Sequence, residues 1–308
     1  MDLRQISYFV ALFEEGSVTR AAQRVHVVQP ALSMQIAKLE RELEQRLFER
    51  RPKMMEPTAT GRTLYRLVQP ILRDLAHART QMKQLSKTVS GRVSMGMLSS
   101  LASSVVPVGL ARFTEAYPRV EVSIADGYST TFIEAVSARE LDLAIINKPP
   151  RKIGLVAHPF LDEEMVVIGA RETPLPVAKP ISMRDLTQLD LILPSTRHGL
   201  RIELDRYLAA EDVSVTAKLE LDLLPAIADL VASSRLFTVL PSIAVCKRLL
   251  DGSLKAYRIV TPRITRQLVV IHHPARPMSV AAMKLVEMLR QELAKATAQL
   301  QKHIIGPD

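Results

Sequence analysis

Residues 16–50 read GSVTRAAQRVHVVQPALSMQIAKLERELEQRLFER, and this stretch decides the fold of the N-terminal part of the chain. Gly16 is suited to ending one helix, and Ser17 can cap the next. After a short connection, a further helix is predicted from Gln29, with Pro30 in its first turn. Two short helices joined by a tight turn predict a helix-turn-helix.

The segments on either side extend this motif. Apolar residues recur at helical spacing over residues 3–13 and predict a preceding amphipathic helix. Residues 47–58 alternate in character and are interrupted by Pro52 and Pro57, which predicts a small β-hairpin, or wing. On pattern alone, a structural three-helix bundle that binds no DNA is the alternative.

A long helix is predicted next, capped by Thr58 or Thr60 and reaching to about residue 87. Its apolar residues recur at alternating intervals of four and three, which predicts a coiled-coil seam and hence a dimer. Pro70 removes one backbone donor and predicts a local kink. The alternative is one amphipathic helix that packs on its own domain. The predicted dimerisation residues are Leu64, Val68, Ile71, Leu75, Ala78, Met82 and Leu85.

Beyond residue 90 the pattern changes to alternating strands and helices. The series over residues 92–146, with a first helix at about 103–117, predicts a parallel sheet covered by helices. A second series over residues 166–298 predicts a second α/β lobe. Between the lobes, Asp162-Glu163-Glu164 is expected to form a solvated loop. In such sheets, ligands bind at the carboxyl ends of strands or between subdomains.

Composition limits the possible functions. The net charge is +9, and residues 1–90 hold 15 Lys and Arg against 9 Asp and Glu, as expected for a part that meets a polyanion. Aromatic residues make up 4% and Trp is absent, which argues against base stacking on single strands. The single cysteine, Cys246, excludes an intramolecular disulfide and is expected to be a packed thiol.

Enzymatic and membrane functions find no support in the sequence. No nucleophile elbow, P-loop or G-x-G-x-x-G pattern is present, and the seven His lack metal-ligand spacing. We therefore expect no enzyme, no cofactor and no metal. No export signal precedes the first helix, and no apolar run approaches the ~20 residues of a membrane span. The expectation is a soluble cytoplasmic protein.

The N-terminal motifs resemble those of the LysR-type transcriptional regulators. The resemblance rests on Ala21-Ala22, Gln29-Pro30-Ala31-Leu32-Ser33, Leu39-Glu40 and Leu47-Phe48-Glu49-Arg50 at these distances, and extends more weakly through 139–145 and 239–241. It implies an α/β fold with a winged helix-turn-helix (1–58), a linker helix (59–88) and a two-lobed, periplasmic-binding-protein-like effector domain (91–308). Lobe I would span about 91–161 and 267–298, and lobe II about 162–266.

Three departures from the family pattern stand out. Val28 replaces a frequent Ser or Thr, so a cap or a phosphate contact is missing there. Met34 replaces a frequent Arg or other polar residue, which is expected to alter sequence preference. Residues 234–237 replace a glycine-rich stretch in the second lobe.

The predicted DNA-binding residues fall into two groups. Base reading is expected from Gln29, Ser33 and Gln35, with Pro30 and Ala31 available to thymine methyl groups. Phosphate contacts are expected from Thr19, Arg20, Lys38, Arg50, Arg51 and Lys53. A solvated or capping role is the alternative for Gln29, and a solvated wing or an internal ion pair is the alternative for the two wing arginines.

The predicted effector-binding residues lie at strand ends, where the family resemblance places ligand contacts. They are Ser99, Ser100, Ser129, Thr130, Thr131, Asn147, Lys148, Ser195, Thr196 and Arg197. Together with Arg201, the cations among them favour an anionic ligand; the alternative is that the hydroxyls only cap helices.

The implied function is that of a sequence-specific transcription regulator controlled by a small anionic effector. The implied partners are double-stranded DNA, the effector, further copies of the chain in a dimer or tetramer, and RNA polymerase. No membrane partner is expected. A solute-binding protein and an enzyme on the α/β scaffold are the rival interpretations, and neither predicts salt-dependent DNA binding.

Overall fold

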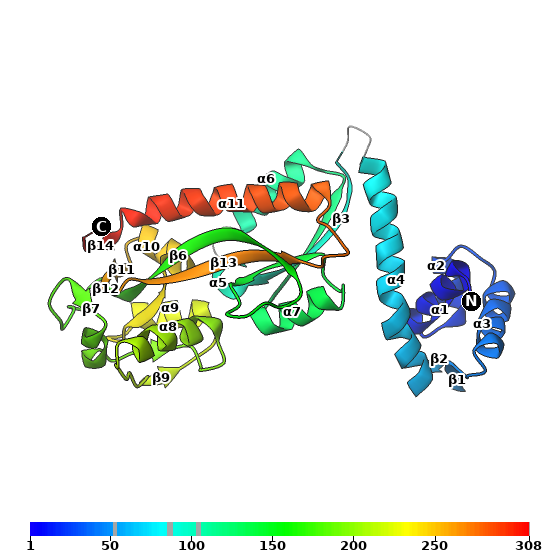
Figure 1. Cartoon of the computed structure of the whole chain (residues 1–308), viewed down its shortest axis with the longest axis horizontal. Coiled ribbons are helices and arrows are strands. Elements are labelled where there is room, and N and C mark those ends of the chain that lie inside the picture. Colours follow the sequence, from blue (N-terminus) through cyan, green and yellow to red (C-terminus); the bar gives the residue numbers. More distant parts are fainter. Residues whose placement is uncertain (52–53, 85–88, 103–105, 308) are drawn as a thin grey trace. The chain divides into compact units, whose positions relative to one another are not determined.

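The computed structural model describes residues 1–51, 54–84, 89–102 and 106–307 (Figure 1). The chain divides into two compact units, residues 1–85 and 86–308. Within the described residues, none of the helices combines the length and the apolar character needed to cross a membrane.

The N-terminal unit contains the predicted helix-turn-helix and wing. Asp2 caps the first helix and forms a reciprocal capping box with Gln5, and Gly16 ends that helix with a φ of 59°. Ser17 caps the next helix by accepting the backbone N–H of Arg20. The elements are α1 (Leu3–Glu15), α2 (Val18–Arg24), α3 (Gln29–Glu42), β1 (Phe48–Arg51), β2 (Met54–Pro57) and α4 (Ala59–Gln84).

One apolar cluster holds these helices together. Phe9, Leu32 and Leu39 are fully buried, and the small Ala21 lets α2 approach closely. Glu40 fixes the path into the wing, because its Oε1 accepts the backbone N–H groups of Leu47 (2.7 Å) and Phe48 (3.2 Å). Packing of Leu39 in this cluster and the hydrogen bonds to Glu40 therefore account for the Leu39-Glu40 pair.

The long helix α4 corrects part of the predicted seam. Thr58 caps it, with Oγ1 accepting the N–H of Gly61 at 3.0 Å, and the helix continues through Pro70. Val68 is 2% exposed and packs with Leu64 in the apolar cluster of its own unit. Val68 is therefore a core residue of its own unit and half-buried Leu64 packs against that core, which at these two positions fits the alternative of an amphipathic helix packed on its own domain.

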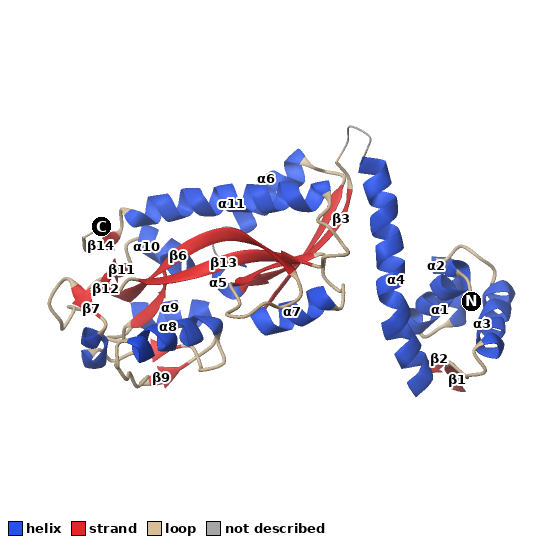
Figure 2. Cartoon of the chain, in the orientation of Figure 1, coloured by secondary structure: helices blue, strands red, loops and turns tan. Residues whose placement is uncertain are grey.

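The C-terminal unit is built on one curved sheet with the strand order β14-β11-β6-β13-β5-β3-β4, with β10 also paired to β6. Figure 2 shows α6, α10 and α11 on one face of the sheet and α7 on the other. The strands are β3 (Gly91–Leu98), β4 (Val120–Gly127), β5 (Leu143–Asn147), β6 (Val156–Ala170), β10 (Thr238–Pro241), β11 (Leu254–Tyr257), β13 (Ile264–His272) and β14 (Ile304–Ile305).

Helices and two small strand pairs complete this unit. The α-helices are α5 (Ser99–Ala102), α6 (Val106–Ala116), α7 (Ser129–Ser137), α8 (Gly199–Ala210), α9 (Leu224–Ala232), α10 (Cys246–Leu250) and α11 (Val280–Gln301), with 3₁₀ turns η1 (Arg184–Gln188) and η2 (Ser242–Val245). The pairs are β7 (Ile181–Ser182) with β12 (Ile259–Thr261) and β8 (Ile192–Leu193) with β9 (Leu219–Glu220).

Two long strands join the lobes and overturn one expectation. Strand β3 pairs in parallel with β4 and β5, as predicted, whereas β13 runs antiparallel to both β5 and β6. The expected solvated loop at residues 162–164 lies inside β6. Its three consecutive acidic residues resemble a loop in sequence, but they alternate between the two faces of the strand and Glu163 is buried.

Candidate functional site

The exposed face of α3 brings several predicted DNA-binding residues together. Gln29 and Pro30 are exposed at the start of the helix, while Ala31 and Ser33 are half-buried. Thr19 Oγ1 donates to Gln29 Oε1 at 3.3 Å, which links α2 to the start of α3 and leaves the Gln29 amide N–H groups as donors. Val28 precedes the helix without a side-chain capping bond, as expected.

Gln35 faces a different direction. It is half-buried, and its Oε1 accepts from Nε2 of Gln5 at 3.4 Å. Gln5 is 2% exposed and also accepts the N–H of Asp2 at 2.9 Å, so it is a fixed partner. This geometry favours a role for Gln35 in positioning α3 against α1, where the sequence had suggested base reading.

The solvent-exposed side of α3 also carries Ala37 and Arg41, which were not among the predicted DNA-binding residues, beside the predicted Lys38. Met34 is 61% exposed, and Ala37, Lys38 and Arg41 are exposed with it. The signal was present in the helical period, because these positions lie opposite the buried Leu32, Ile36 and Leu39.

The predicted phosphate contacts differ in their surroundings. Arg20 is ion-paired with Glu15 (3.5 Å) and also donates to the Glu15 backbone carbonyl. Its neighbour Arg24 pairs with Glu14 and Glu15, and the hydrogen bond that Arg24 donates to Glu14 raises the pKa of Arg24 further above its usual range. Arg50 and Arg51 belong to β1, and Lys53 lies outside the described residues, as does Leu85 of the predicted seam.

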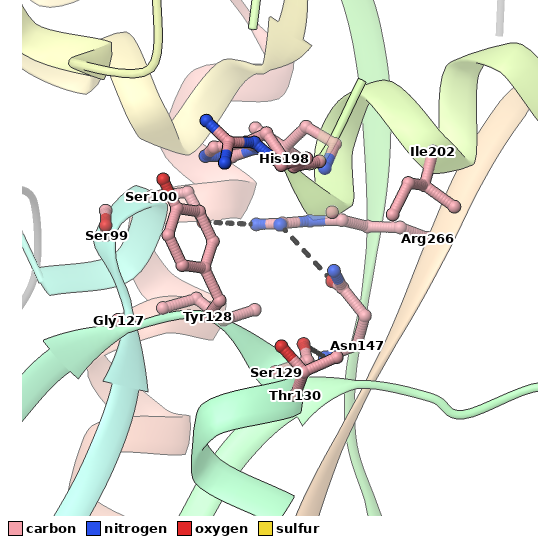
Figure 3. A pocket seen from close by; sticks show the side chains of 14 residues that line it. Ser99, Ser100, Gly127, Tyr128, Ser129, Thr130, Asn147, His198, Ile202 and Arg266 are labelled. Carbon is pink, nitrogen blue, oxygen red and sulfur yellow. Dashed lines mark hydrogen bonds between the residues drawn. The ribbon is translucent and has the colours of Figure 1, made fainter. Parts of the chain in front are cut away.

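A small cavity lies where the strands of the C-terminal unit end, and Figure 3 shows its lining. Its volume is about 60 Å³, and it is lined by residues of β3, α5, β4, β5 and β13 and by the starts of α7 and α8. The lining residues are Leu98, Ser99, Ser100, Gly127, Tyr128, Ser129, Thr130, Asn147, Arg197, His198, Gly199, Leu200, Ile202 and Arg266.

Arg266 is the central polar side chain of this cavity, and the sequence argument missed it. Its guanidinium donates to Glu163 Oε2 (2.5 Å), Ser100 Oγ (2.7 Å) and, more weakly, Asn147 Oδ1 (3.5 Å; Figure 3). Arg266 is 2% exposed and Glu163 4%. Every second residue of β13 points to its buried face, and these residues are Ile264, Arg266, Leu268 and Val270. This alternation places the arginine on the buried face, and it is the sequence signal by which Arg266 could have been found.

Tyr128 and His198 cover the cavity from opposite lobes. Their rings meet edge to face with centroids 5.7 Å apart, and Tyr128 OH donates to Asp222 Oδ2 at 3.4 Å. Burial lowers the pKa of His198, although Asp222 opposes this, and His198 Nδ1 accepts the N–H of Leu200. Both observations favour a neutral imidazole with its proton on Nε2.

Asp222 is held by Ser195, a predicted effector residue that does not line the cavity. The backbone N–H and the hydroxyl of Ser195 donate to its two carboxylate oxygens at 2.8 and 3.0 Å. Burial works against the charged form of Asp222, but these bonds outweigh it and lower the pKa of the carboxyl.

Six of the ten predicted effector residues line the cavity: Ser99, Ser100, Ser129, Thr130, Asn147 and Arg197. Thr131, Lys148, Ser195 and Thr196 do not, and Lys148 instead donates to Gln267 Oε1 at 2.8 Å. Arg201 is ion-paired with Asp205 (2.8 Å) and Glu220 (3.2 Å), so its charge is already neutralised. Successive residues of a strand point to opposite faces, so Lys148 points away from the face on which Asn147 lines the cavity. A prediction that only notes which residues follow a strand does not include this alternation.

The hydroxyls at the start of α7 are not helix caps. The N-cap position is Tyr128, which makes no side-chain capping bond, and Ser129 Oγ accepts the backbone N–H of Asn147 at 3.3 Å. The first backbone N–H groups of α7 therefore face the cavity region without a side-chain cap, an arrangement that suits an anion. Among the described residues, no group of three or more His, Cys, Asp or Glu can hold a metal ion.

Comparisons with known proteins cover both units. The chain matches the model of the bacterial regulatory helix-turn-helix protein, lysR family, over residues 3–62, and that of the LysR substrate binding domain over residues 86–294. It is 29% identical over 271 residues to the nitrogen assimilation regulatory protein nac of Klebsiella aerogenes, covering 87% of each chain. It is 25% identical over 296 residues to the hydrogen peroxide-inducible genes activator of Dickeya chrysanthemi, covering 95% of this chain and 96% of that one.

Solved structures agree on the fold. A full-length OxyR variant from Pseudomonas aeruginosa superposes with a TM-score of 0.70 at 23% identity, covering 95% of this chain and 94% of that chain. Full-length CbnR in complex with its target DNA gives a TM-score of 0.64 at 20% identity, covering 95% and 100%. The relatives are regulators rather than enzymes. The chain belongs to the LysR family of transcription regulators, with a DNA-binding helix-turn-helix and a substrate-binding effector domain.

Proposed function

We propose that this regulator responds to a small, compact anion bound in the cavity around Arg266. One observation carries the proposal: buried N–H donors of Arg266 and the uncapped start of α7 converge on a space lined by hydroxyl groups. A volume of about 60 Å³ accommodates roughly four to six water-sized positions, which limits the effector to a few non-hydrogen atoms.

An uncharged polar effector is the second candidate. Glu163 already neutralises Arg266 within the buried pair, and Asp126 and Asp222 lie near the cavity wall, where they accept hydrogen bonds from Ser99 and Ser195. Exposed Arg197 then supplies the remaining positive side chain of the lining. These carboxylates offset the positive charge of Arg266 and Arg197, and that offset favours a neutral ligand as the second candidate.

A thermal-shift titration tests the effector class. Sulfate, phosphate and acetate are added to the full-length protein at constant ionic strength, with chloride as the reference salt. We expect one of these anions to raise the Tm saturably, and the rise to be much smaller in the variants Ser100→Ala and Arg197→Ala. Equal shifts in all three proteins, or no saturable shift, would contradict an anionic effector and direct the screen to small neutral polar compounds.

For DNA recognition we propose that α3 enters the major groove with Gln29, Pro30 and Ser33 at base edges. The exposed face of α3 and the Thr19–Gln29 hydrogen bond support this orientation. The exposed Lys38 and the wing residues Arg50, Arg51 and Lys53 would contact phosphates. Arg41 on the same exposed face is a further candidate.

We propose self-association along the exposed side of α4. Ile71 is 48% exposed and Met82 69%, and the exposed Ala78 shares their side of the helix with half-buried Leu75. Leu67, 65% exposed, replaces Leu64 and Val68 at the N-terminal end of this seam. A dimer or tetramer would present paired DNA-binding units to two half-sites, and RNA polymerase is the partner expected at the promoter.

The effector would act by shifting a conformational equilibrium. Tyr128 and Asp222 come from different lobes, so a ligand beneath them favours the arrangement in which the lobes are in contact. A ligand can shift the equilibrium only by its difference in affinity for the two arrangements. DNA affinity changes if the paired DNA-binding units fit their half-sites in one arrangement better than in the other.

A further inference from the structure

A second concave surface lies on the reverse side of the strands that form the effector cavity. It is a groove of about 640 Å³ between the β5–β6 loop and the strands β6 and β13. Its apolar wall includes Pro149, Pro150, Ile153 and Leu155. A volume of this size is within the range of about 300–1,000 Å³ that is typical of small-molecule sites.

Strand alternation separates the groove from the effector cavity. On one face, Arg266 is opposite Glu163, and this pair belongs to the cavity side. On the other face, Gln267 is opposite Asp162, and both residues line the groove. Asn147 and Lys148 divide in the same way at the end of β5, so adjacent residues of the same strands serve two separate spaces.

The rim of the groove is positively charged. Lys148, Arg151 and Lys152 are exposed on one side, and Asp162 is the acidic side chain of the lining. Lys148 Nζ donates to Gln267 Oε1 at 2.8 Å, whereas Arg151 and Lys152 make no side-chain hydrogen bond or ion pair with any residue that the structure describes. Two cations beside an apolar wall favour a ligand that carries a negative charge on a hydrocarbon body.

We propose that this groove binds an organic carboxylate with an aromatic or branched apolar body, at a site distinct from the effector cavity. The body packs on the proline-rich wall, and the carboxylate lies at Arg151 and Lys152. A small molecule is the occupant we propose because the groove's volume is in the range typical of such sites and two adjacent exposed cations can bind a single carboxylate. A ligand of about ten or more non-hydrogen atoms exceeds the roughly four to six water-sized positions available in the 60 Å³ cavity, so size alone separates the two sites.

The test uses 1-naphthoate and isothermal titration calorimetry on the full-length protein. We expect saturable binding that weakens by about fivefold or more in the double variant Arg151→Ala/Lys152→Ala, as for the loss of two exposed charge contacts. The methyl ester of the same acid should bind more weakly than the acid. Lys255→Ala, which removes an exposed cation of β11, is the matched control and should leave the affinity unchanged.

Three outcomes would overturn the proposal. The first is the absence of saturable binding by the folded wild-type protein. The second is binding that Arg151→Ala/Lys152→Ala leaves intact but Ser100→Ala abolishes, which would place naphthoate in the effector cavity. The third is tighter binding of a Glu- and Leu-rich peptide than of 1-naphthoate through the same two cations, which would identify the groove as a protein-docking surface. Ile153→Asp supplies an independent check, since it removes apolar contact from a half-buried loop position.

Discussion

Arg266 and Glu163 form an ion pair that is almost completely removed from water, so each charge depends on the other. Desolvation makes such a pair a poor source of net stability, but removing one partner leaves an uncompensated buried charge. Glu163 Oε1 has no hydrogen-bond partner among the described residues, which adds to the cost of the arrangement. Residues kept at such a cost are often functional, in agreement with the place of Arg266 in the cavity.

The first prediction concerns this pair. Glu163→Gln should lower the free energy of unfolding by about 3–5 kcal/mol, because Arg266 loses its counter-charge. The neighbouring Asp162→Asn, on the exposed face of the same strand, is the control and should change it by no more than about 0.5 kcal/mol. Urea unfolding followed by circular dichroism measures both, and equal effects of the two substitutions would contradict the burial argument.

The second prediction concerns base reading. Gln29→Ala should reduce the preference for an operator over scrambled DNA by about 1–3 kcal/mol, while non-specific affinity changes little. Gln23→Ala, an exposed glutamine of α2, is the control. Competition gel shifts at two salt concentrations give both quantities. If specific and scrambled DNA lost affinity equally, Gln29 would be a phosphate or structural contact.

The third prediction concerns pH. Because the pKa of Asp222 is lowered in the folded protein, its carboxylate stabilises the fold above the unfolded-state pKa, and this contribution is lost as the pH falls through the folded value. The stability difference between wild type and Asp222→Asn should therefore be largest near neutral pH and should shrink below about pH 4. Urea midpoints at pH 7, 5 and 3 measure it; a difference that is constant with pH would contradict the role of ionisation.

At the scale of single elements, a helix or strand could be predicted from the sequence when the residues that determine it lie close together along the chain. The helix-turn-helix was predictable because Gly16, Ser17 and Pro30 act through their own backbone and neighbours. The strand at 166–169 was predicted, but its extension through residues 162–164 was not, because Glu163 and Glu164 pair with Arg266 and Arg258, which lie 103 and 94 positions away. The four-residue α5 was also missed, since it carries no periodic signal. Hydroxyl residues at strand ends were found, but which face each one occupies depends on register.

The fourth prediction concerns α4. Ile71→Glu should raise the dissociation constant of the dimer at least about tenfold, because it places a charge on the proposed apolar seam. Arg66→Glu on the same helix is exposed outside that seam and serves as the control. Sedimentation velocity across a concentration series gives the constants. A seam through Val68 would instead predict that Ile71→Glu leaves association unchanged.

At the scale of the whole molecule, the single cysteine restricts how the protein can respond to oxidants. Cys246 is half-buried, and burial raises the pKa of its thiol, so little reactive thiolate forms near neutral pH. The fifth prediction is that Cys246→Ser leaves operator affinity unchanged, and that hydrogen peroxide has the same effect on both proteins. Gel shifts before and after peroxide treatment measure this, and a peroxide response confined to the wild type would identify Cys246 as a sensor.

The continuity of β6 and β13 bears on how the effector domain can move. Both strands run without interruption from one lobe into the other, and their shared ladder shifts register between Leu268 and Val269, opposite Pro159 and Leu161. We therefore expect the two lobes to rotate relative to each other by elastic twisting of this hydrogen-bonded pair of strands, and not about a flexible loop. Such twisting permits only small rotations. Amide hydrogen–deuterium exchange should then remain slow along both strands with or without effector, while the backbone near Tyr128 and His198 exchanges faster when the cavity is empty.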